Sequence, residues 1–288
     1  MSVQQSFARM QHTRPSRHLG SRILKGLCYA SMLLTVGTLL LIVGYILVQG
    51  VPHLKPSLFE IDYNSDNVSM FHAIINTVLM TALALIIAVP LGVFGGIYLA
   101  EYAKPGSRAV KAVRITAETL AGLPSIIYGL FGMLSFVTVL RWSYSLISGA
   151  CTLAVMTLPV ILRQTEESLL SVPLSYREGS FGLGAGRLRT TIKIVLPVAT
   201  PGILAAVLLS IGRMVGETAA LIYTAGTVPK IYDSLTSSGR TLSVHLFQLQ
   251  QEAFHLNEAF AVAVVLLVLV LAMNAASTLV ARKLTRKG

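Results

Sequence analysis

Six segments of this sequence are long enough and apolar enough to cross a lipid bilayer, and this feature constrains the fold most. A helix needs about 20 mostly apolar residues to span the hydrocarbon core. The expected spans cover residues 27–49, 73–100, 115–140, 143–162, 200–225 and 258–281. The segment Leu27–Val48 contains no charged residue and is too long for a signal-peptide core, so we interpret it as a retained span. The sequence therefore predicts an all-α integral membrane protein with six transmembrane helices.

The composition excludes a water-soluble enzyme. Hydrophobic residues make up 54 % of the 288 residues and charged residues only 12 %, against about 25 % charged residues in soluble domains. The mean hydropathy is +0.71. Cys28 and Cys151 both lie in apolar runs, which excludes a disulfide scaffold and a cysteine metal site. The six histidines are scattered without ligand spacing, so we expect no metal site.

Basic residues are concentrated on one expected side of the membrane. Of the 23 lysines and arginines, 18 lie in the segment 1–26, in the loops after the second and fourth spans, and in the tail 282–288. The opposite loops contain only Lys55, Arg141, Lys230 and Arg240, and Arg213 lies within the fifth span. By the positive-inside rule, both termini and the loop 163–199 are cytoplasmic. This distribution accounts for the net charge of +11 without nucleic-acid binding.

The loop 163–199 is too long for a simple helix hairpin. Pro173 predicts the start of a short helix and the glycines of 182–186 its end, and a second helix is expected from Arg187 to Leu196. The glycine run lacks the Lys-Ser/Thr of a phosphate-binding loop, so we exclude a nucleotide site there. From these residues alone, an amphipathic helix lying on the lipid headgroups is an equally good interpretation.

The spacing within this loop resembles the EAA loop of permease subunits in ATP-binding-cassette (ABC) importers. The matching positions are Glu178-Gly-Ser, Gly184 and Ile194-x-Leu196-Pro197, although Gly179 and Ser180 replace the two alanines of the family pattern. In that family the loop forms a coupling helix that docks on the ATP-hydrolysing subunit. The resemblance implies that the residues that couple to the ATPase are Glu178, Gly179, Ser180, Gly184, Ile194, Leu196 and Pro197.

Other stretches between about residues 70 and 225 resemble the phosphate-importer permeases of the PstA type. They are Asn76-Thr77, Val89–Gly92, Tyr98–Tyr102, Gly122–Phe131, Leu158-Pro159, Arg163–Glu167 and Arg213–Ala219. The chain departs from the family at Ala220, where proline is common. This departure predicts that the fifth helix continues through that point.

The resemblance implies a type I ABC importer permease-like bundle and a function as the membrane-spanning subunit of an ATP-driven phosphate importer. The expected organisation is a basic cytoplasmic segment (1–26), a transmembrane permease domain (27–281) and a basic tail (282–288). The chain itself would have no catalytic residues and bind no cofactor. ATP and Mg²⁺ would bind to two separate ATP-binding subunits, and the other partners would be a homologous permease subunit, a phosphate-binding protein, phosphate and lipid. The expected location is the bacterial inner membrane.

Arg213 and Glu217 are one helical turn apart within the fifth expected span. A charge near the bilayer centre costs at least about 2.5–3.5 kcal/mol, so it normally faces an interior or a wet path. One interpretation is a structural ion pair. The other is a substrate path for an oxyanion, since guanidinium can bind phosphate oxygens bidentately. The expected path residues are Ser210, Arg213, Glu217, Thr218 and Arg163, although Arg163 could instead mark the membrane boundary.

Rival functions remain open at this point. A permease for another oxyanion, such as molybdate or sulfate, would share these features. An ion-driven secondary transporter is a further alternative, but it would not need an EAA-type loop. An intramembrane enzyme would need a nucleophile and a base in reach of each other, and the sequence offers no convincing set. The loop 226–257 would suit contact with a soluble binding protein, or it is a plain solvated loop.

Overall fold

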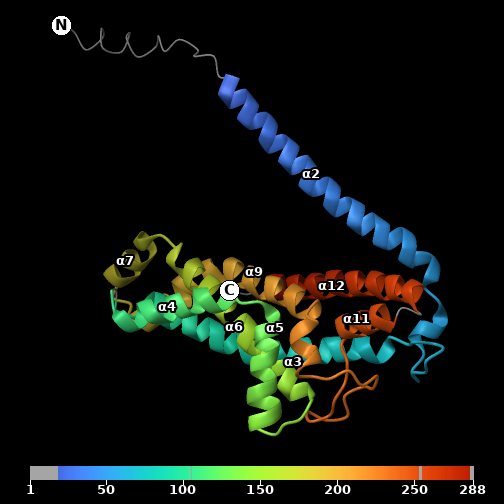
Figure 1. Ribbon diagram of the computed structural model, residues 1–288. Helices are drawn as coiled ribbons and strands as arrows, with labels where there is room; N and C mark the ends of the chain where they lie inside the picture. The colour runs from blue at the N-terminus through green and yellow to red at the C-terminus, as the bar shows by residue number, and fades with distance from the viewer. Residues whose placement is uncertain (1–18, 105, 253–254, 286–288) are drawn as a thin grey trace. The chain divides into compact units, whose positions relative to one another are not determined.

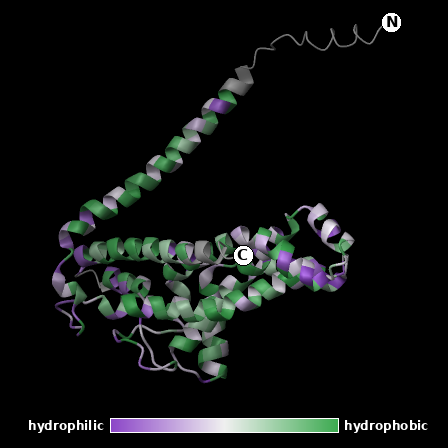
Figure 2. Cartoon of the chain, turned by 180° about the vertical axis from the view of Figure 1, so that it is seen from behind, coloured by the Kyte–Doolittle hydropathy of each residue, from purple (hydrophilic) through white to green (hydrophobic). Residues whose placement is uncertain are grey.

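A computed structural model describes residues 19–104, 106–252 and 255–285, and the regular structure of these residues is helical throughout (Figure 1). The chain divides into two compact units, Met1–Val48 and Gln49–Gly288. The first unit contains most of α2 (Leu19–Gly50), an uninterrupted helix whose described side chains are largely exposed. Hydrophobic residues are exposed along most of its length (Figure 2), as expected for a helix in contact with hydrocarbon. The predicted first span is therefore present as a single helix.

The second unit is a bundle of long helices joined by short helical turns. Its elements are η1 (Val51–His53), η2 (Pro56–Phe59), α3 (Phe71–Ile97), η3 (Tyr98–Tyr102), α4 (Arg108–Ala121), α5 (Ser125–Gly132), η4 (Met133–Val139), α6 (Leu146–Leu170), α7 (Leu174–Gly182), α8 (Arg187–Thr190), η5 (Thr191–Val195), α9 (Leu196–Val215), α10 (Ala219–Ile222), α11 (Leu242–Glu252) and α12 (Leu256–Thr285). The turns η3, η4 and η5 are π-helical.

Among the described residues, five helices are long and apolar enough to cross a membrane. The pair formed by α4 and α5–η4, bent by 104°, makes a sixth span if it counts as one. The expected span over 115–140 is therefore present, but Gly122–Pro124 divides it into two helices at a sharp angle. The fifth span also differs, because a continuous helical stretch runs from Arg187 through Pro197 to Val215. Pro197 lies in the first turn of α9, directly after the π turn η5.

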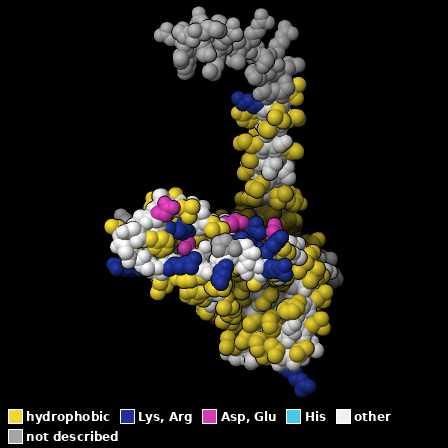
Figure 3. Space-filling view, turned by 90° about the vertical axis from the view of Figure 1, so that its left-hand side faces the viewer, with side chains coloured by type: hydrophobic (Ala, Val, Ile, Leu, Met, Phe, Trp, Pro, Cys, Tyr) yellow, Lys and Arg dark blue, Asp and Glu magenta, His cyan; other side chains and the backbone are white. Residues whose placement is uncertain are grey.

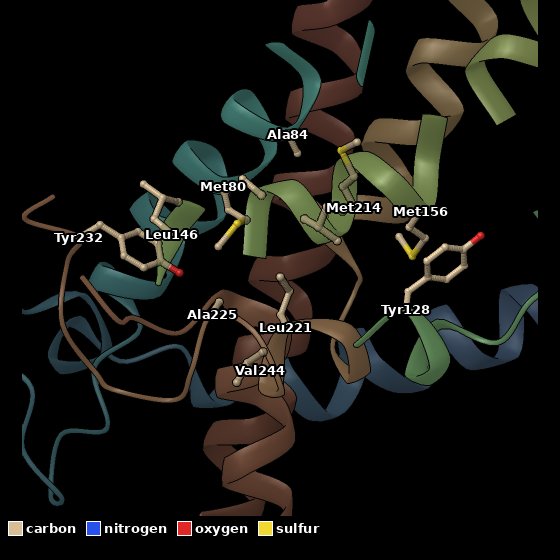
Figure 4. Packing of buried hydrophobic residues seen from close by; sticks show 12 residues of the cluster. Met80, Ala84, Tyr128, Leu146, Met156, Met214, Leu221, Ala225, Tyr232 and Val244 are labelled. Carbon is tan, nitrogen blue, oxygen red and sulfur yellow. The ribbon is translucent and has the colours of Figure 1, made fainter. Parts of the chain in front are cut away.

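The helix α6 lies at the centre of the second unit and is the most buried of the five long spans. It packs closely on α3 because glycines allow the two backbones to approach. A Cβ atom at Gly96 would lie 2.7 Å from Cβ of Thr165, and one at Gly92 would lie 2.7 Å from Ile161. Beside this contact, side chains from α3, α5, α6, α9, α10 and α11 converge on one core that includes Met80, Met156, Met214 and Leu221 (Figure 4).

The bundle has two chemically different ends. One end, called the basic end below, is formed by η3, α4, the last turns of α6, and α7 to η5. Its cations are Lys104, Arg108, Lys111, Arg114, Arg163, Arg177, Arg187, Arg189 and Lys193, and Figure 3 shows lysine and arginine side chains gathered in a band on this face. At the opposite end, Asn76 of α3 forms hydrogen bonds with the loop that follows α10. Its amide donates to the carbonyls of Lys230 and Arg240 and accepts from the Tyr232 N–H.

Candidate functional site

Two broken spans meet inside the bundle. The third span bends at Gly122–Pro124, and the Tyr128 hydroxyl donates to the Leu120 carbonyl at 2.6 Å, which satisfies the end of α4. The fifth span stops at Val215 and resumes as α10. The helices α5 and α10 then pack against each other so closely that a Cβ at Gly129 would lie 2.9 Å from the Cα of Ala220. Non-helical backbone at membrane depth is tolerated only inside protein or beside a wet cavity, so these breaks mark the interior of the bundle.

Glu217 lies in the break between α9 and α10 and stabilises it. Its carboxylate oxygen Oε1 accepts the backbone N–H of Ala220 at 3.1 Å, at the start of α10. The Ser243 hydroxyl of α11 donates to the Glu217 carbonyl at 2.6 Å. The residue is 8 % exposed. The predicted continuation of the fifth helix through Ala220 is therefore wrong, because side-chain and backbone acceptors at Glu217 replace the helical hydrogen bonds.

Arg213 occupies the last turn of α9 and is exposed in this chain. The interpretation that Glu217 holds it in an ion pair is not supported, since the ion pairs among the described residues do not include one between these two side chains. The Arg213 side chain lies one turn before the break that begins at Gly216. Its charge also faces the negative end of the α9 dipole. Arg213 thus presents a cation where the two broken spans meet.

The other expected path residues are placed differently from Arg213. The Ser210 hydroxyl is buried and donates to the Ala206 carbonyl of its own helix at 2.9 Å. Thr218 lies in the break and is partly buried. Arg163 lies at the basic end, where it pairs with Glu118 at 3.2 Å and Glu167 at 2.9 Å. Two carboxylates already neutralise its charge, so the geometry favours a boundary role over an anion path for Arg163.

The predicted coupling helix is present as α7, which begins after Pro173 and ends at Gly182. Glu178 and Gly179 are exposed, and so are the apolar side chains of Leu174, Tyr176 and Phe181. Ser180 is buried, and its hydroxyl shares a hydrogen bond of 2.8 Å with the Thr190 hydroxyl of α8.

Ile194 and Leu196 were expected in a separate helix, with Pro197 leading from it into the fifth span. They lie instead within the continuous stretch that becomes α9. The short helix of the EAA-like loop therefore presents an exposed surface and continues through α8 and η5 into the fifth span.

Sequence reasoning missed two buried clusters. At the basic end, Arg177 of α7 binds Glu101 of η3 with Nη2 and Oε1 2.6 Å apart. At the opposite end, the Arg240 guanidinium lies 4.5 Å from the centre of the Tyr63 ring and donates to His72. His245 of α11 belongs to the same cluster, and burial lowers its pKa to about 2, so it is neutral. The residues of each cluster are far apart in the sequence, so motif spacing gives no signal for them.

Taken together, the two broken spans, the exposed cation beside them and the exposed short helix are typical of a polytopic membrane transport protein. The family of binding-protein-dependent transport system inner membrane components matches residues 92–286. The chain belongs to this family, and the resemblance recognised from its motifs is confirmed.

Curated relatives place the chain further within this family. It is 36 % identical over 231 residues to the probable ABC transporter permease protein YqgI of Bacillus subtilis, covering 73 % of this chain and 78 % of that protein. It is 33 % identical over 211 residues to the phosphate transport system permease protein PstA of Haemophilus influenzae, covering 73 % of this chain and 74 % of that protein. The match to PstA 1 of Mycobacterium tuberculosis is 38 % identical and covers 54 % of this chain, but only 51 % of that relative.

Solved structures agree on the fold. The inward-facing MetNI methionine ABC transporter matches with a TM-score of 0.58 and 20 % identity over 74 % of this chain and 93 % of that chain. A bacterial alginate ABC transporter, solved with an alginate pentasaccharide-bound periplasmic protein, matches with a TM-score of 0.63 and 16 % identity over 93 % of this chain and 99 % of that chain. The predicted fold class, an all-α permease bundle of the type I importer kind, is confirmed.

Proposed function

We propose that this chain is the membrane-spanning subunit of an ATP-driven phosphate importer and that Arg213 contacts the passing phosphate. The observation that carries this proposal is the exposed Arg213 guanidinium at the meeting point of two broken spans. The phosphate assignment is supported by the PstA relatives, which cover up to 73 % of this chain. A guanidinium fork matches two phosphate oxygens at once.

Glu217 offers a way to prefer phosphate over sulfate. One of its carboxylate oxygens is already bonded to the Ala220 N–H. The second oxygen would accept a hydrogen bond from a protonated phosphate oxygen. Sulfate has no proton to donate at neutral pH, so a carboxylate beside the path would repel it. This is the reason to favour phosphate over sulfate or molybdate among the oxyanions.

The partners follow from the same family assignment. The chain contributes no catalytic residue, and ATP with Mg²⁺ would bind to two separate ATP-binding subunits docked on α7 through Glu178 and its neighbours. A second, homologous permease subunit would complete the path as a heterodimer, and a phosphate-binding protein would deliver the substrate to the opposite end of the bundle. No nucleic acid is involved.

The basic end is proposed to face the cytoplasm, with both termini on that side of the bacterial inner membrane. After replacement of Cys28 and Cys151, single cysteines are introduced at Ser65, Thr236 or Ser171, all of which are exposed. An impermeant thiol reagent added to intact cells from outside should label positions 65 and 236 and miss position 171. The opposite labelling pattern would overturn this orientation.

Competition in a reconstituted complex tests the substrate. We expect ATP-dependent uptake of labelled phosphate in proteoliposomes that contain the chain, its permease and ATPase partners and the binding protein. An excess of unlabelled phosphate should block the uptake of labelled phosphate, and the same concentration of sulfate or molybdate should not. Block by sulfate or molybdate would assign the chain to another oxyanion, and uptake driven by an ion gradient without ATP would favour a secondary transporter.

A further inference from the structure

One arginine of α7 faces the bundle, although most of this helix is exposed. Arg177 immediately precedes Glu178, the expected ATPase contact, but its side chain is only 13 % exposed. The partner carboxylate of Glu101 is 7 % exposed. Burying two charges is costly unless geometry and additional hydrogen bonds compensate for the lost water. The geometry around Arg177 supplies this compensation.

The Arg177 guanidinium joins three elements of the basic end. Nη2 lies 2.6 Å and Nε 3.2 Å from Oε1 of Glu101, in the turn η3 that ends the second span. Nη1 and Nη2 also donate to the carbonyls of Val172 and Leu169, each at 2.8 Å, where α6 ends. A planar fork that makes these bonds together holds one orientation. The second span, the fourth span and α7 are therefore tied at one point.

The local backbone places Glu101 for this contact. The turn η3 (Tyr98–Tyr102) is π-helical, and such turns re-aim the side chains that follow a regular helix. Arg187 of α8 adds a second connection to the same turn, with its guanidinium 5.3 Å from the centre of the Tyr102 ring. Pro173 precedes α7 and the glycines 182, 184 and 186 lie at its end.

We propose that the Glu101–Arg177 ion pair is a rigid link that fixes the orientation of α7 relative to the second and fourth spans. Through this link, a displacement of α7 by the ATP-hydrolysing partner moves these two spans. The inference rests on the proposed function, since it assigns the link to the coupling step of the same transporter. Glu101 and Arg177 act as positioning residues, and neither contacts the transported anion.

Three variants separate this role from simple stabilisation. Glu101→Gln leaves Arg177 as a buried charge without its carboxylate, so both stability and coupling should fall. Glu101→Gln combined with Arg177→Gln removes the lone charge, so thermal stability should recover while the link stays broken. Glu166→Gln is the matched control, because Glu166 is a buried carboxylate at the same end whose ion pair with Arg114 joins α4 to α6 and not to α7.

The first measurement does not depend on transport. Spin labels are placed on cysteines at Lys104 and Ser175, both exposed, after replacement of Cys28 and Cys151, and their distance distribution is recorded in the full complex. We expect a narrow distribution in the wild type and the Glu166→Gln control. Both variants that lack Glu101 should give a broad one. A narrow distribution in the double variant would overturn the link.

The second measurement is the number of ATP molecules hydrolysed per anion imported. This ratio should rise by a factor of about five or more in both variants that lack Glu101, and it should stay unchanged in the control. A factor of about five is the lower end of the usual range of coupling between two sites. Normal coupling in the double variant would show that the pair is only structural. If the wild-type complex fails to import phosphate but its distance distribution is narrow and depends on Glu101, the proposed substrate is wrong and the link stands.

Discussion

A complex that carries Arg213→Gln is expected to assemble normally and to import phosphate about 10- to 100-fold more slowly than the wild-type complex. This range corresponds to the loss of a charged hydrogen-bond donor, typically about 1.5–3 kcal/mol. Assembly should persist because Arg213 is exposed in this chain and its removal leaves no buried charge unpaired. The measurement is ATP-dependent phosphate uptake in proteoliposomes, normalised to complex recovered by gel filtration.

Arg213→Lys is the graded control for this result. Lysine keeps the positive charge but loses the planar fork, so it should retain attraction for the anion and lose bidentate contact. The expected order of uptake is therefore wild type, then Lys, then Gln. Uptake by the Gln variant at the wild-type rate would remove Arg213 from the path.

Glu217→Gln separates the path from the alternative of a structural ion pair. The amide oxygen can still accept the Ala220 N–H, so the start of α10 should survive. In the double variant with Arg213→Gln, Glu217→Gln removes a negative charge that repels anions. It does not restore the guanidinium donor, so specific phosphate uptake should stay low. If Arg213→Gln assembles poorly and the double variant recovers both assembly and uptake, the two residues form a structural pair.

Hydropathy and turn chemistry were sufficient to predict the elements whose causes are local. The first span follows from the uncharged run Leu27–Val48, and α7 follows from Pro173 and the glycines after it. Both signals depend on residues within or beside the element itself. The spacing of the EAA-like loop added the family, which the comparison over residues 92–286 confirms.

The break in the fifth span was not predictable in the same way, because its causes are tertiary. The stop after Val215 depends on Ser243 of α11, which donates to the Glu217 carbonyl from 26 positions away. The close packing of Gly129 on Ala220 holds α10 against α5. Neither contact leaves a periodic signal, so a hydropathy window joins the two helices into one expected span.

The buried ion pair at the basic end illustrates a second limit. Glu101 and Arg177 are 76 positions apart, and each taken alone is indistinguishable from a charge at a membrane boundary. Charge counting assigned Arg177 to the basic excess of the loop. Only the folded arrangement shows that its charge is paired inside the bundle.

Gly184→Val is expected to reduce phosphate import by about tenfold and to weaken the attachment of the ATPase subunit, while the membrane bundle still folds. Gly184 has φ = +80°, a conformation in which a β-branched residue is strongly disfavoured. For ordinary residues this conformation costs about 1–2 kcal/mol, and about 1.4 kcal/mol corresponds to a factor of ten. The measurements are phosphate uptake and co-purification of the ATPase with the affinity-tagged chain.

The physical reason is the way in which α7 ends. The Gly184 N–H donates to the Phe181 carbonyl at 2.9 Å, and the Ala185 N–H donates to the Ser180 carbonyl at 3.1 Å. These two bonds form a Schellman motif, which needs a left-handed residue at this position. Valine would break the motif and change the direction in which the chain leaves α7. The exposed side of α7, on which the ATPase is proposed to dock, would then change its orientation.

Two neighbouring substitutions distinguish a conformational effect from a steric one. Gly184→Asn should retain most activity, since asparagine tolerates the left-handed conformation. Gly182→Ala should be harmless, because Gly182 is the last helical residue of α7 and an added Cβ meets no atom within 4 Å. Open space also surrounds Gly184, so a loss restricted to valine must come from the backbone. Full transport and normal ATPase recovery in Gly184→Val would refute the coupling role of this loop, because the strained residue would then have no consequence for docking.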